Sequence, residues 1–248
     1  MTPNVLLTIL IPSFNGAGAL VGALESIAQQ TFTDFEVLVI DGGSRDNTTD
    51  IITAYAHLPI RFYSEPDEGI YDAINKGIGL SCGAFIYVLG CDDRLAGADV
   101  LASIFTNEEA LRSHVVYGNV RMSSTQRIYD GKFTSSKLVQ RNICHQAIFT
   151  HRTVFERLGR YERRYRVFAD WEFNMRWFYA DWVKKTYLPV VVAHYTDTGF
   201  SARQPDETFW QEHDQLLRQH LSAPAYHLRK AAGQLLPRRL VTLLKKHF

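Results

Sequence analysis

The sequence predicts an α/β fold built on a parallel, doubly wound sheet, and two observations support this. In the first half of the chain, short apolar runs alternate with longer stretches whose apolar residues recur at helical spacing. The connections between them are short, as in parallel strands joined by crossover helices. Ligands of such sheets bind beyond the carboxyl ends of the strands, so the candidate site residues are those that follow each strand.

The expected strands of the first half are almost wholly apolar, as buried strands are. They are Leu6–Ile11, Phe35–Ile40, Ile60–Tyr63 and Ala84–Leu89. The helices between them show apolar residues at helical spacing or cap-forming residues at their start. They are Ala17–Gln30, Thr48–Ala56 and Tyr71–Leu80.

The second half is less regular. Its expected strands are Val115–Tyr117 and Pro189–His194, and its expected helices are His151–Leu158 and Asp170–Ala180. From Pro205 onward the pattern is helical, with breaks at Pro224 and Pro237. We therefore expect one domain over residues 1–203, with halves 1–95 and 96–203, followed by a helical extension over residues 204–248.

Composition and charge exclude several classes of protein. The 248 residues are 46% apolar with a net charge of +1, so no overall field draws the chain onto nucleic acid. No apolar run approaches the ~20 residues that span a bilayer, and Val5–Ile11 lacks the flanks of a signal peptide. Cys82, Cys91 and Cys144 are not spaced as a zinc or redox pair, which indicates free thiols in a reducing cytoplasm.

The C-terminal segment from Tyr226 to Phe248 mixes leucines with six basic residues, Arg229, Lys230, Arg238, Arg239, Lys245 and Lys246. This pattern predicts a basic amphipathic helix or helix pair. Its apolar face either packs on the domain or lies on an anionic membrane, where each basic side chain contributes about 1 kcal/mol. The second alternative predicts a peripheral contact with the inner face of the cytoplasmic membrane.

Acidic residues follow several of the predicted strands. Asp41 follows the second, Asp67 and Glu68 come after the third, and Asp92 and Asp93 follow the fourth. Carboxylates gathered at one crevice repel one another, and a hard cation with oxygen ligands relieves that repulsion. If the ligand is a diphosphate, Mg²⁺ or Mn²⁺ would bridge the two. Taken singly, such residues are more often solvated turn residues or helix caps.

Three linked motifs carry a family resemblance. They are Pro12-Ser13-Phe14-Asn15 after the first strand, Gln29–Glu36, and Val39–Thr48. In this order they resemble the family 2 glycosyltransferases, over about residues 5–203 and most specifically over 5–95. The segment Pro66–Gly77 is similar to a narrower subgroup that acts in bacterial surface polysaccharide synthesis, of the colanic-acid type.

The resemblance implies a GT-A fold with a Rossmann-like nucleotide-binding half, a mixed sheet and C-terminal helices. It implies transfer of a sugar, with inversion, from a nucleotide-diphosphate sugar to a glycan or lipid-linked saccharide. A divalent cation, Mg²⁺ or Mn²⁺, would hold the diphosphate. The partners are then the donor and the acceptor, with no nucleic acid.

The resemblance also assigns donor-side residues. Phe14 would stack near the base, Asp41 would accept a hydrogen bond from uracil or its counterpart, and Asp93 would hold the metal. This chain has Asp92-Asp93 where many relatives have Asp-x-Asp or Asp-Asp-Asp, so Asp92 would reach the ribose or the metal. The remaining expected site residues on the donor side are Pro12, Asn15, Glu68, Gly69, Asp72, Asn75 and His194. The His145-Gln146 pair would lie close to the acceptor side.

Inverting transfer needs a base near the acceptor hydroxyl. Relatives carry an acidic residue followed by Asp, with the Asp as base, which implies Asp170 here; Ala169 replaces the first acid. Asp170 is also suited to cap the helix that follows. Glu172 is the substitute, but residues at i and i+2 of a helix do not share a face.

Two other functions fit parts of the sequence. The glycines at 16, 18 and 22, with Asp41 downstream, approach a dinucleotide-binding fingerprint and suggest an NAD-dependent oxidoreductase. Pro12–Asn15 separates the strand from those glycines, whereas the fingerprint needs the turn at once. Ala169 allows a non-catalytic nucleotide-sugar-binding protein, but the presence of both Asp93 and Asp170 favours an enzyme.

Overall fold

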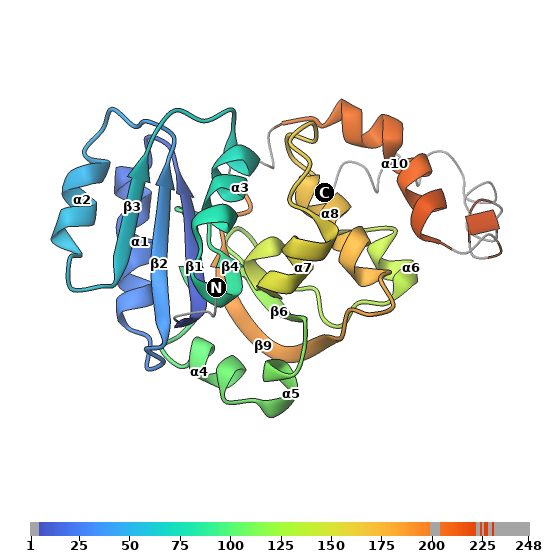
Figure 1. Ribbon diagram of the computed structural model, residues 1–248, viewed down its shortest axis with the longest axis horizontal. Coiled ribbons are helices and arrows are strands. Elements are labelled where there is room, and N and C mark those ends of the chain that lie inside the picture. Colours follow the sequence, from blue (N-terminus) through green and yellow to red (C-terminus); the bar gives the residue numbers. More distant parts are fainter. Residues whose placement is uncertain (1–4, 199–203, 222–223, 225, 228–229, 231–248) are drawn as a thin grey trace.

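The computed structural model describes residues 5–198, 204–221, 224, 226–227 and 230. Within them, nine strands form one sheet in the order β3-β2-β1-β4-β8-β6-β9-β5, with β7 paired to β6 (Figure 1). The strands are β1 Val5–Ser13, β2 Phe35–Asp41, β3 Ile60–Ser64, β4 Gly83–Val88, β5 Arg94–Leu95, β6 Val115–Met122, β7 Ile128–Tyr129, β8 Ile148–His151 and β9 Lys185–Tyr195.

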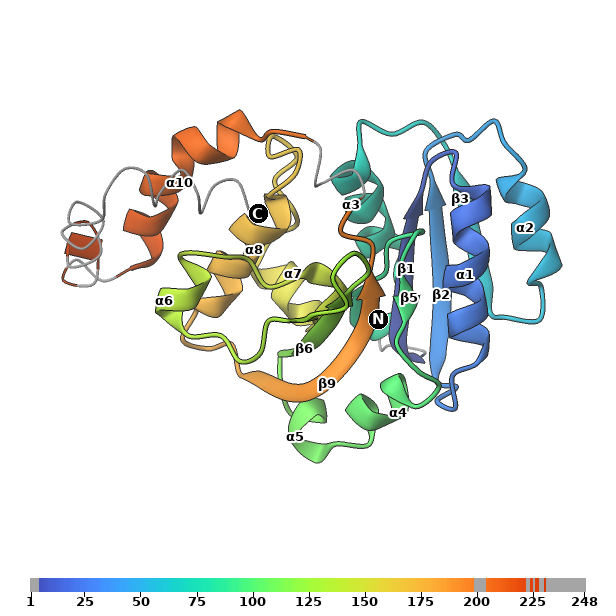
Figure 2. The ribbon, with the colours of Figure 1, turned by 180° about the vertical axis from the view of Figure 1, so that it is seen from behind.

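Helices cover both faces of this sheet. On one face α1 and α4 pack against Leu7 and Ile9 of β1; on the other, α3, α7 and α8 share a core with Leu10. Figure 2 shows α1 in front of the strands, whereas α1 lies behind them in Figure 1. The helices are α1 Ala17–Ala28, α2 Thr48–Ala54, α3 Ile70–Leu80, α4 Val100–Phe105, α5 Glu108–Leu111, α6 Ser135–Leu138, α7 Arg152–Leu158, α8 Ala169–Phe178 and α10 Glu207–His220, with the 3₁₀ turn η1 His145–Ala147.

The parallel, doubly wound arrangement predicted from the sequence is confirmed for β3-β2-β1-β4, and the expected elements there shift by only a few residues. In the second half the sheet becomes mixed, as expected, through a strand that the pattern did not predict. β8 pairs antiparallel with both β4 and β6. β8 has only four residues and ends at His151, where the sequence predicts that a helix begins. So short an apolar run does not by itself indicate a strand.

The strands β1 and β4 part near their carboxyl ends, and we call the region between those ends the crevice. Their pairing ends at Leu10 and Val88, whereas β1 stays paired with β2 as far as Ser13. Pro12 has no N–H to donate, and it lies past the end of the β4 ladder, where none is needed. Strand order reverses at β1, since β2 and β3 lie on one side and β4 on the other. This is the switch point at which sheets of this kind bind ligands.

Pro189 lies inside β9, a long strand that pairs with β6. The register shifts there, from Tyr117 opposite Tyr187 to Asn119 opposite Val191. A Cβ on Gly118 would lie 2.6 Å from the Val190 carbonyl oxygen, so the two backbones approach closely. The bulge accommodates a proline that a regular ladder would exclude.

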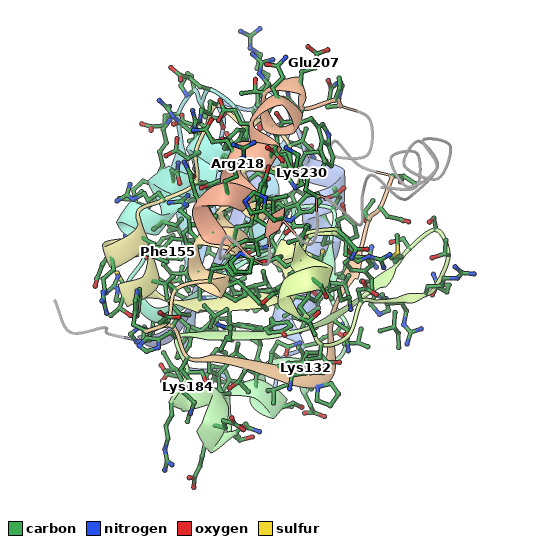
Figure 3. All side chains as sticks on the ribbon, turned by 90° about the vertical axis from the view of Figure 1, so that its right-hand side faces the viewer. Lys132, Phe155, Lys184, Glu207, Arg218 and Lys230 are labelled. Carbon is green, nitrogen blue, oxygen red and sulfur yellow. The ribbon has the colours of Figure 1, made fainter. Side chains whose placement is uncertain are left out.

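The described part of the C-terminal extension belongs to the core. α10 lies against α8, with Phe209 and Leu217 wholly buried. In Figure 3, α10 runs from Glu207 to Arg218 across the face of the molecule that is turned toward the viewer. The basic amphipathic segment from Tyr226 lies largely outside the described residues, so its membrane contact stays a prediction. Among the helices that are described, none is long and apolar enough to cross a bilayer.

Buried Glu36 ties the parallel strands together at their amino-terminal side. Its carboxylate accepts hydrogen bonds from Thr8 Oγ1 on β1 (2.7 Å), the Cys82 N–H before β4 (2.6 Å) and the Arg61 guanidinium on β3 (2.8 Å). Burial alone would raise the pKa of Glu36, but the bonds from Thr8, Arg61 and Cys82 lower it below its ordinary value. The ionised carboxylate therefore stabilises the fold.

We expect Glu36→Gln to lower the free energy of unfolding at pH 7 by roughly 1–3 kcal/mol, because the amide cannot accept the Arg61 bond. The folded pKa lies below the unfolded one, so the wild-type advantage is complete above the unfolded pKa of about 4.3 and is lost as pH falls through the folded pKa. Urea denaturation at several pH values measures this. Glu25→Gln, at an exposed position of α1, is the control; an equal effect there would contradict the assignment.

Candidate active site

The loop after β2 is ordered by Asp41, which is only 1% exposed. Its carboxylate accepts hydrogen bonds from the Ser44 N–H (2.8 Å), the Gly43 N–H (3.1 Å), Ser64 Oγ (2.7 Å) and Ser44 Oγ. Three of these donors bind Oδ2 and one binds Oδ1, so Oδ1 keeps room for a further donor. Asp41 therefore holds the loop in shape, and its predicted contact with a nucleotide base stays a prediction.

Phe14 and Asp67 face each other across Gly42. Phe14 is 64% exposed at the mouth of the crevice. A Cβ on Gly42 would clash with the Asp67 carboxylate and come within 3.2 Å of the Phe14 ring. Asn15 links the first loop to the second, since its N–H donates to Ser44 Oγ (2.7 Å). An aromatic face beside a carboxylate suits a nucleotide base, which offers a ring and N–H donors.

Ser13 ends β1 inside the crevice. Its hydroxyl is buried, and no described residue provides it with a hydrogen-bond partner. A Cβ on Gly16 would lie 3.4 Å from Ser13 Oγ and 3.2 Å from Cys91 Sγ, so a side chain at position 16 would be in tight contact with both. Buried hydroxyls normally find a partner, which points to a ligand or a water molecule here.

Asp93 lies just past β4 and is 1% exposed, whereas its neighbour Asp92 is exposed. The Asp93 carboxylate accepts hydrogen bonds from the Thr196 N–H (2.7 Å) beyond β9 and from Gln146 Nε2 (2.6 Å) in η1. Burial, together with the neighbouring Asp92 carboxylate, raises the pKa of Asp93 to about 6, although the Thr196 and Gln146 bonds act to lower it.

The chemistry of this pair fits a divalent cation. Two adjacent carboxylates supply the oxygen ligands that Mg²⁺ and Mn²⁺ prefer, and a cation would offset both the burial of Asp93 and its repulsion by Asp92. Across the described ranges, no three His, Cys, Asp or Glu side chains converge as a complete ligand set. Mg²⁺ sites often use one or two carboxylates and take their other ligands from water and substrate phosphates.

Asp170 lies in the first turn of α8 and is 7% exposed. Its Oδ1 accepts a hydrogen bond from the Trp171 N–H (2.8 Å) and lies 3.1 Å from the Tyr71 hydroxyl. Its Oδ2 accepts from Asn142 Nδ2 (2.7 Å) and lies 3.4 Å from His145 Nδ1. The sequence also suited Asp170 to cap α8, and in the structure this capping consists of the bond from the Trp171 N–H.

A chain of buried side chains fixes Asn142 in turn. Asn174 Nδ2 donates to Asn142 Oδ1 (2.8 Å), and Trp177 Nε1 donates to Asn174 Oδ1 (2.8 Å). Both supporting residues lie on α8, the helix that carries Asp170. One helix therefore presents the carboxylate and also positions the amide that binds it.

The turn η1 connects Asp170 with Asp93. His145 contacts Asp170, and the next residue, Gln146, donates to Asp93. The sequence predicts His145 as a site residue. In the structure it contacts Asp170 and belongs to the turn that also contacts Asp93. The sequence singled out Gln146 only as the partner of His145, in a polar pair before an apolar stretch, and did not predict its contact with Asp93.

The motif on α3 lies against the segment that leads into α8. Tyr71 donates to the Val167 carbonyl (2.7 Å), and the Asn75 amide exchanges two hydrogen bonds with the backbone of Tyr161 (2.8 and 3.0 Å). Asp72 and Glu68 both pair with Arg163, at 2.6 and 3.1 Å. These contacts support the residues before Asp170. They differ from the nucleotide contacts expected of Glu68, Gly69, Asp72 and Asn75, which remain predictions.

Two further predicted residues lie elsewhere. His194 stands opposite Arg94 in the β5–β9 ladder and lines a cavity of about 460 Å³ beside α4, with Arg121 and Ser103. Its expected contact with a phosphate or a metal stays a prediction. Glu172 pairs with Arg176 on the same helix at 2.8 Å. That pairing leaves Asp170 as the candidate base.

Comparisons with known proteins agree with this geometry. The profile of glycosyl transferase family 2 matches residues 8–165. PGL/p-HBAD biosynthesis glycosyltransferases of Mycobacterium bovis and Mycobacterium tuberculosis are 44% identical over 200 residues, covering 78% of this chain and 78% of theirs. The narrower colanic-acid type expected from Pro66–Gly77 is corrected by these relatives. The family match also removes the oxidoreductase alternative.

Solved structures share the fold. TarS 1-349 of S. aureus, in complex with UDP-GlcNAc, superposes with a TM-score of 0.74 at 16% identity over 89% of this chain and 69% of that one. This chain spans 41% of the longer TarS chain. The mannosyltransferase PcManGT of Pyrobaculum calidifontis, with GDP-Man and Mn²⁺, gives 0.63 at 16% identity, over 98% of this chain and 85% of its own. The fold is therefore GT-A.

We expect Asp93→Asn to stabilise the ligand-free protein at pH 8 by roughly 1–3 kcal/mol, because the buried charge disappears. The folded pKa of about 6 lies above the unfolded one, so the wild type loses stability as pH rises through this range. The difference should shrink below pH 6 and vanish near the unfolded pKa of about 3.9. Thermal denaturation across pH measures it, with Asp92→Asn as the exposed control. A variant less stable than the wild type at pH 8 would contradict the role of burial.

Proposed function

Since the chain belongs to glycosyl transferase family 2 and is a nucleotide-sugar-dependent enzyme, we propose that it transfers the sugar with inversion to a saccharide carried by a lipid. One observation supports this most: the turn η1 contacts both Asp93, at the crevice between β1 and β4, and Asp170, on α8. These contacts support the proposal that a donor-side carboxylate and a base act in one site.

The donor nucleotide is proposed to lie in this crevice. Phe14 and Asp67 would receive the base, and the Ser13 hydroxyl, which lacks a partner among the described residues, would bind the nucleotide further in. Asp93 and Asp92 would hold a divalent cation. When bound, that cation would neutralise charge on the diphosphate as it leaves.

Asp170 is proposed as the base. The oxygen of the acceptor hydroxyl forms a bond to the anomeric carbon from the face opposite the diphosphate. The bond from that carbon to the diphosphate oxygen breaks, and its electron pair leaves with the nucleotide diphosphate. The hydroxyl proton passes to the Asp170 carboxylate, which Asn142 and Tyr71 hold in position.

The acceptor side carries aromatic surface. Trp210 of α10 is 41% exposed and lies 5.6 Å, ring to ring, from Phe168, which immediately precedes α8. Such rings suit the faces of sugar or aryl groups. The mycobacterial relatives are described as acting in PGL/p-HBAD biosynthesis. We propose an acceptor of the same kind, a glycolipid with an apolar carrier.

Asp170→Asn should lower kcat by roughly 10²–10⁴, because the amide cannot take the proton. Donor affinity should change little, since the nucleotide crevice lies between β1 and β4. Transfer rate and nucleotide-sugar affinity are measured on the same preparation. Glu172→Gln, two residues along α8, is the control: it breaks the pair with Arg176 and should retain kcat in the folded protein. If Asp170→Asn transfers at the wild-type rate, the base lies elsewhere, with His145 next to be tested.

Asp93→Ala should abolish transfer, and EDTA should do the same to the wild type, because the diphosphate would lose its cation. In thermal-shift assays we expect uridine or thymidine diphosphate to stabilise the wild type with Mn²⁺, guanosine diphosphate being the other nucleotide to test. Asp93→Ala should lose that stabilisation. Full transfer in EDTA would overturn the metal-dependent part of the proposal.

A further inference from the structure

Gln146 makes a contact that packing alone does not require. The side chain is 4% exposed, and its Nε2 donates to Asp93 Oδ2 at 2.6 Å. Its main chain is held separately, because the Tyr87 hydroxyl donates to the Gln146 carbonyl oxygen at 3.0 Å. The position of η1 therefore does not depend on the side-chain amide alone, and the contact of that amide with Asp93 calls for its own explanation.

Cys144 sets the direction of this amide. Its Sγ lies 2.9 Å from Gln146 Oε1, to which the thiol donates. Since an ionised carboxylate only accepts hydrogen bonds, Nε2 must face Asp93 and Oε1 must face the thiol. The polarity is consistent along the chain, from S–H to amide oxygen and from amide N–H to carboxylate. The side chain is thus held in one of its two amide orientations.

Gln146 and Thr196 approach the Asp93 carboxylate through different oxygens. Thr196 N–H binds Oδ1, and Gln146 binds Oδ2. A carboxylate held by one donor alone turns about its Cβ–Cγ bond, whereas one donor on each oxygen fixes its plane. The lone pairs that these donors leave free then point in a fixed direction.

We infer that Gln146 is a positioning residue, which fixes the plane of the Asp93 carboxylate for a divalent cation bound with the nucleotide diphosphate, and that Cys144 fixes the amide of Gln146. The inference rests on the proposed function, which supplies the cation and the nucleotide. It assigns Gln146 no contact with either. Its effect on both is transmitted through Asp93.

The test is calorimetric titration with uridine diphosphate and, separately, guanosine diphosphate, each with and without Mn²⁺. Gln146→Leu removes the donor and keeps a buried apolar side chain of similar size. We expect it to reduce the gain in nucleotide affinity that Mn²⁺ confers on the wild type by roughly ten- to a hundred-fold, the effect of losing a hydrogen bond to a charged group. Nucleotide affinity without Mn²⁺ should stay unchanged. Gln146→Met, which keeps the chain length, replaces the leucine variant if that one does not fold.

Two controls separate positioning from structure. Gln140→Leu makes the same change at an exposed position whose amide binds only the Ser136 carbonyl, and should retain the full Mn²⁺ gain. Cys144→Ala should lower the gain by roughly two- to ten-fold, and Cys144→Ser, which keeps a donor, should restore it.

The outcomes are distinguishable. If Gln146→Leu keeps the wild-type Mn²⁺ gain, the inference is overturned and the proposed function stands. If nucleotide affinity falls equally with and without Mn²⁺, Gln146 shapes the pocket, which also overturns the inference. If the wild type itself gains nothing from Mn²⁺, the metal-dependent part of the proposed function fails together with the inference.

Discussion

The site depends on a carboxylate that is buried and to which, within the described ranges, no cationic side chain is bound. Asp93 stands where β4 ends, and its two oxygens receive donors from the end of β9 and from η1. Three segments far apart in sequence therefore meet at one side chain. Because burial disfavours the charged form, the protein holds Asp93 in a state that a cation would relieve. The arrangement costs stability in the empty protein and favours the loaded one.

The second carboxylate is held differently. Asp170 accepts hydrogen bonds from its own helix and from Asn142, and the Tyr71 hydroxyl lies 3.1 Å from it; among the described residues, His145 is the basic side chain that contacts it. Tyr71 comes from α3, and the α3 motif also grips Tyr161 and Arg163 just ahead of α8. The α3 segment thus supports the residue that is proposed to act on the acceptor.

The first half of the fold follows from the sequence because each buried strand there is an unbroken apolar run ending in a polar turn. The polar residues after those runs, Asp41 and Asp93, do lie at the carboxyl edge of the sheet. The sequence could not show which groups each of these side chains binds by hydrogen bonds. Asp41 serves its own loop, and Asn75 serves the backbone of Tyr161. These contacts join residues 86 positions apart in the case of Asn75, and no local pattern encodes them.

Short strands and β-bulges were the other features that the sequence did not predict. β8 has four residues, and Pro189 inside β9 argued for a strand beginning there, whereas β9 begins at Lys185. The close approach of Gly118 to the β9 backbone allows the bulge that accommodates Pro189 inside β9. This approach follows from the pairing of β6 with β9 and not from the local sequence.

The continuity of the sheet also bears on how such enzymes exchange parts. β8 lies between β4, in residues 1–95, and β6, in residues 96–203, and pairs with both. A cut at residue 95 would expose the edge of β4 on one piece and the edge of β8 on the other, and exposed edges can pair with other strands. Halves taken from two relatives would need matching strand registers before they could fold together. New acceptor preferences are therefore expected to arise by replacing connecting loops within one chain, and grafting of whole halves is disfavoured.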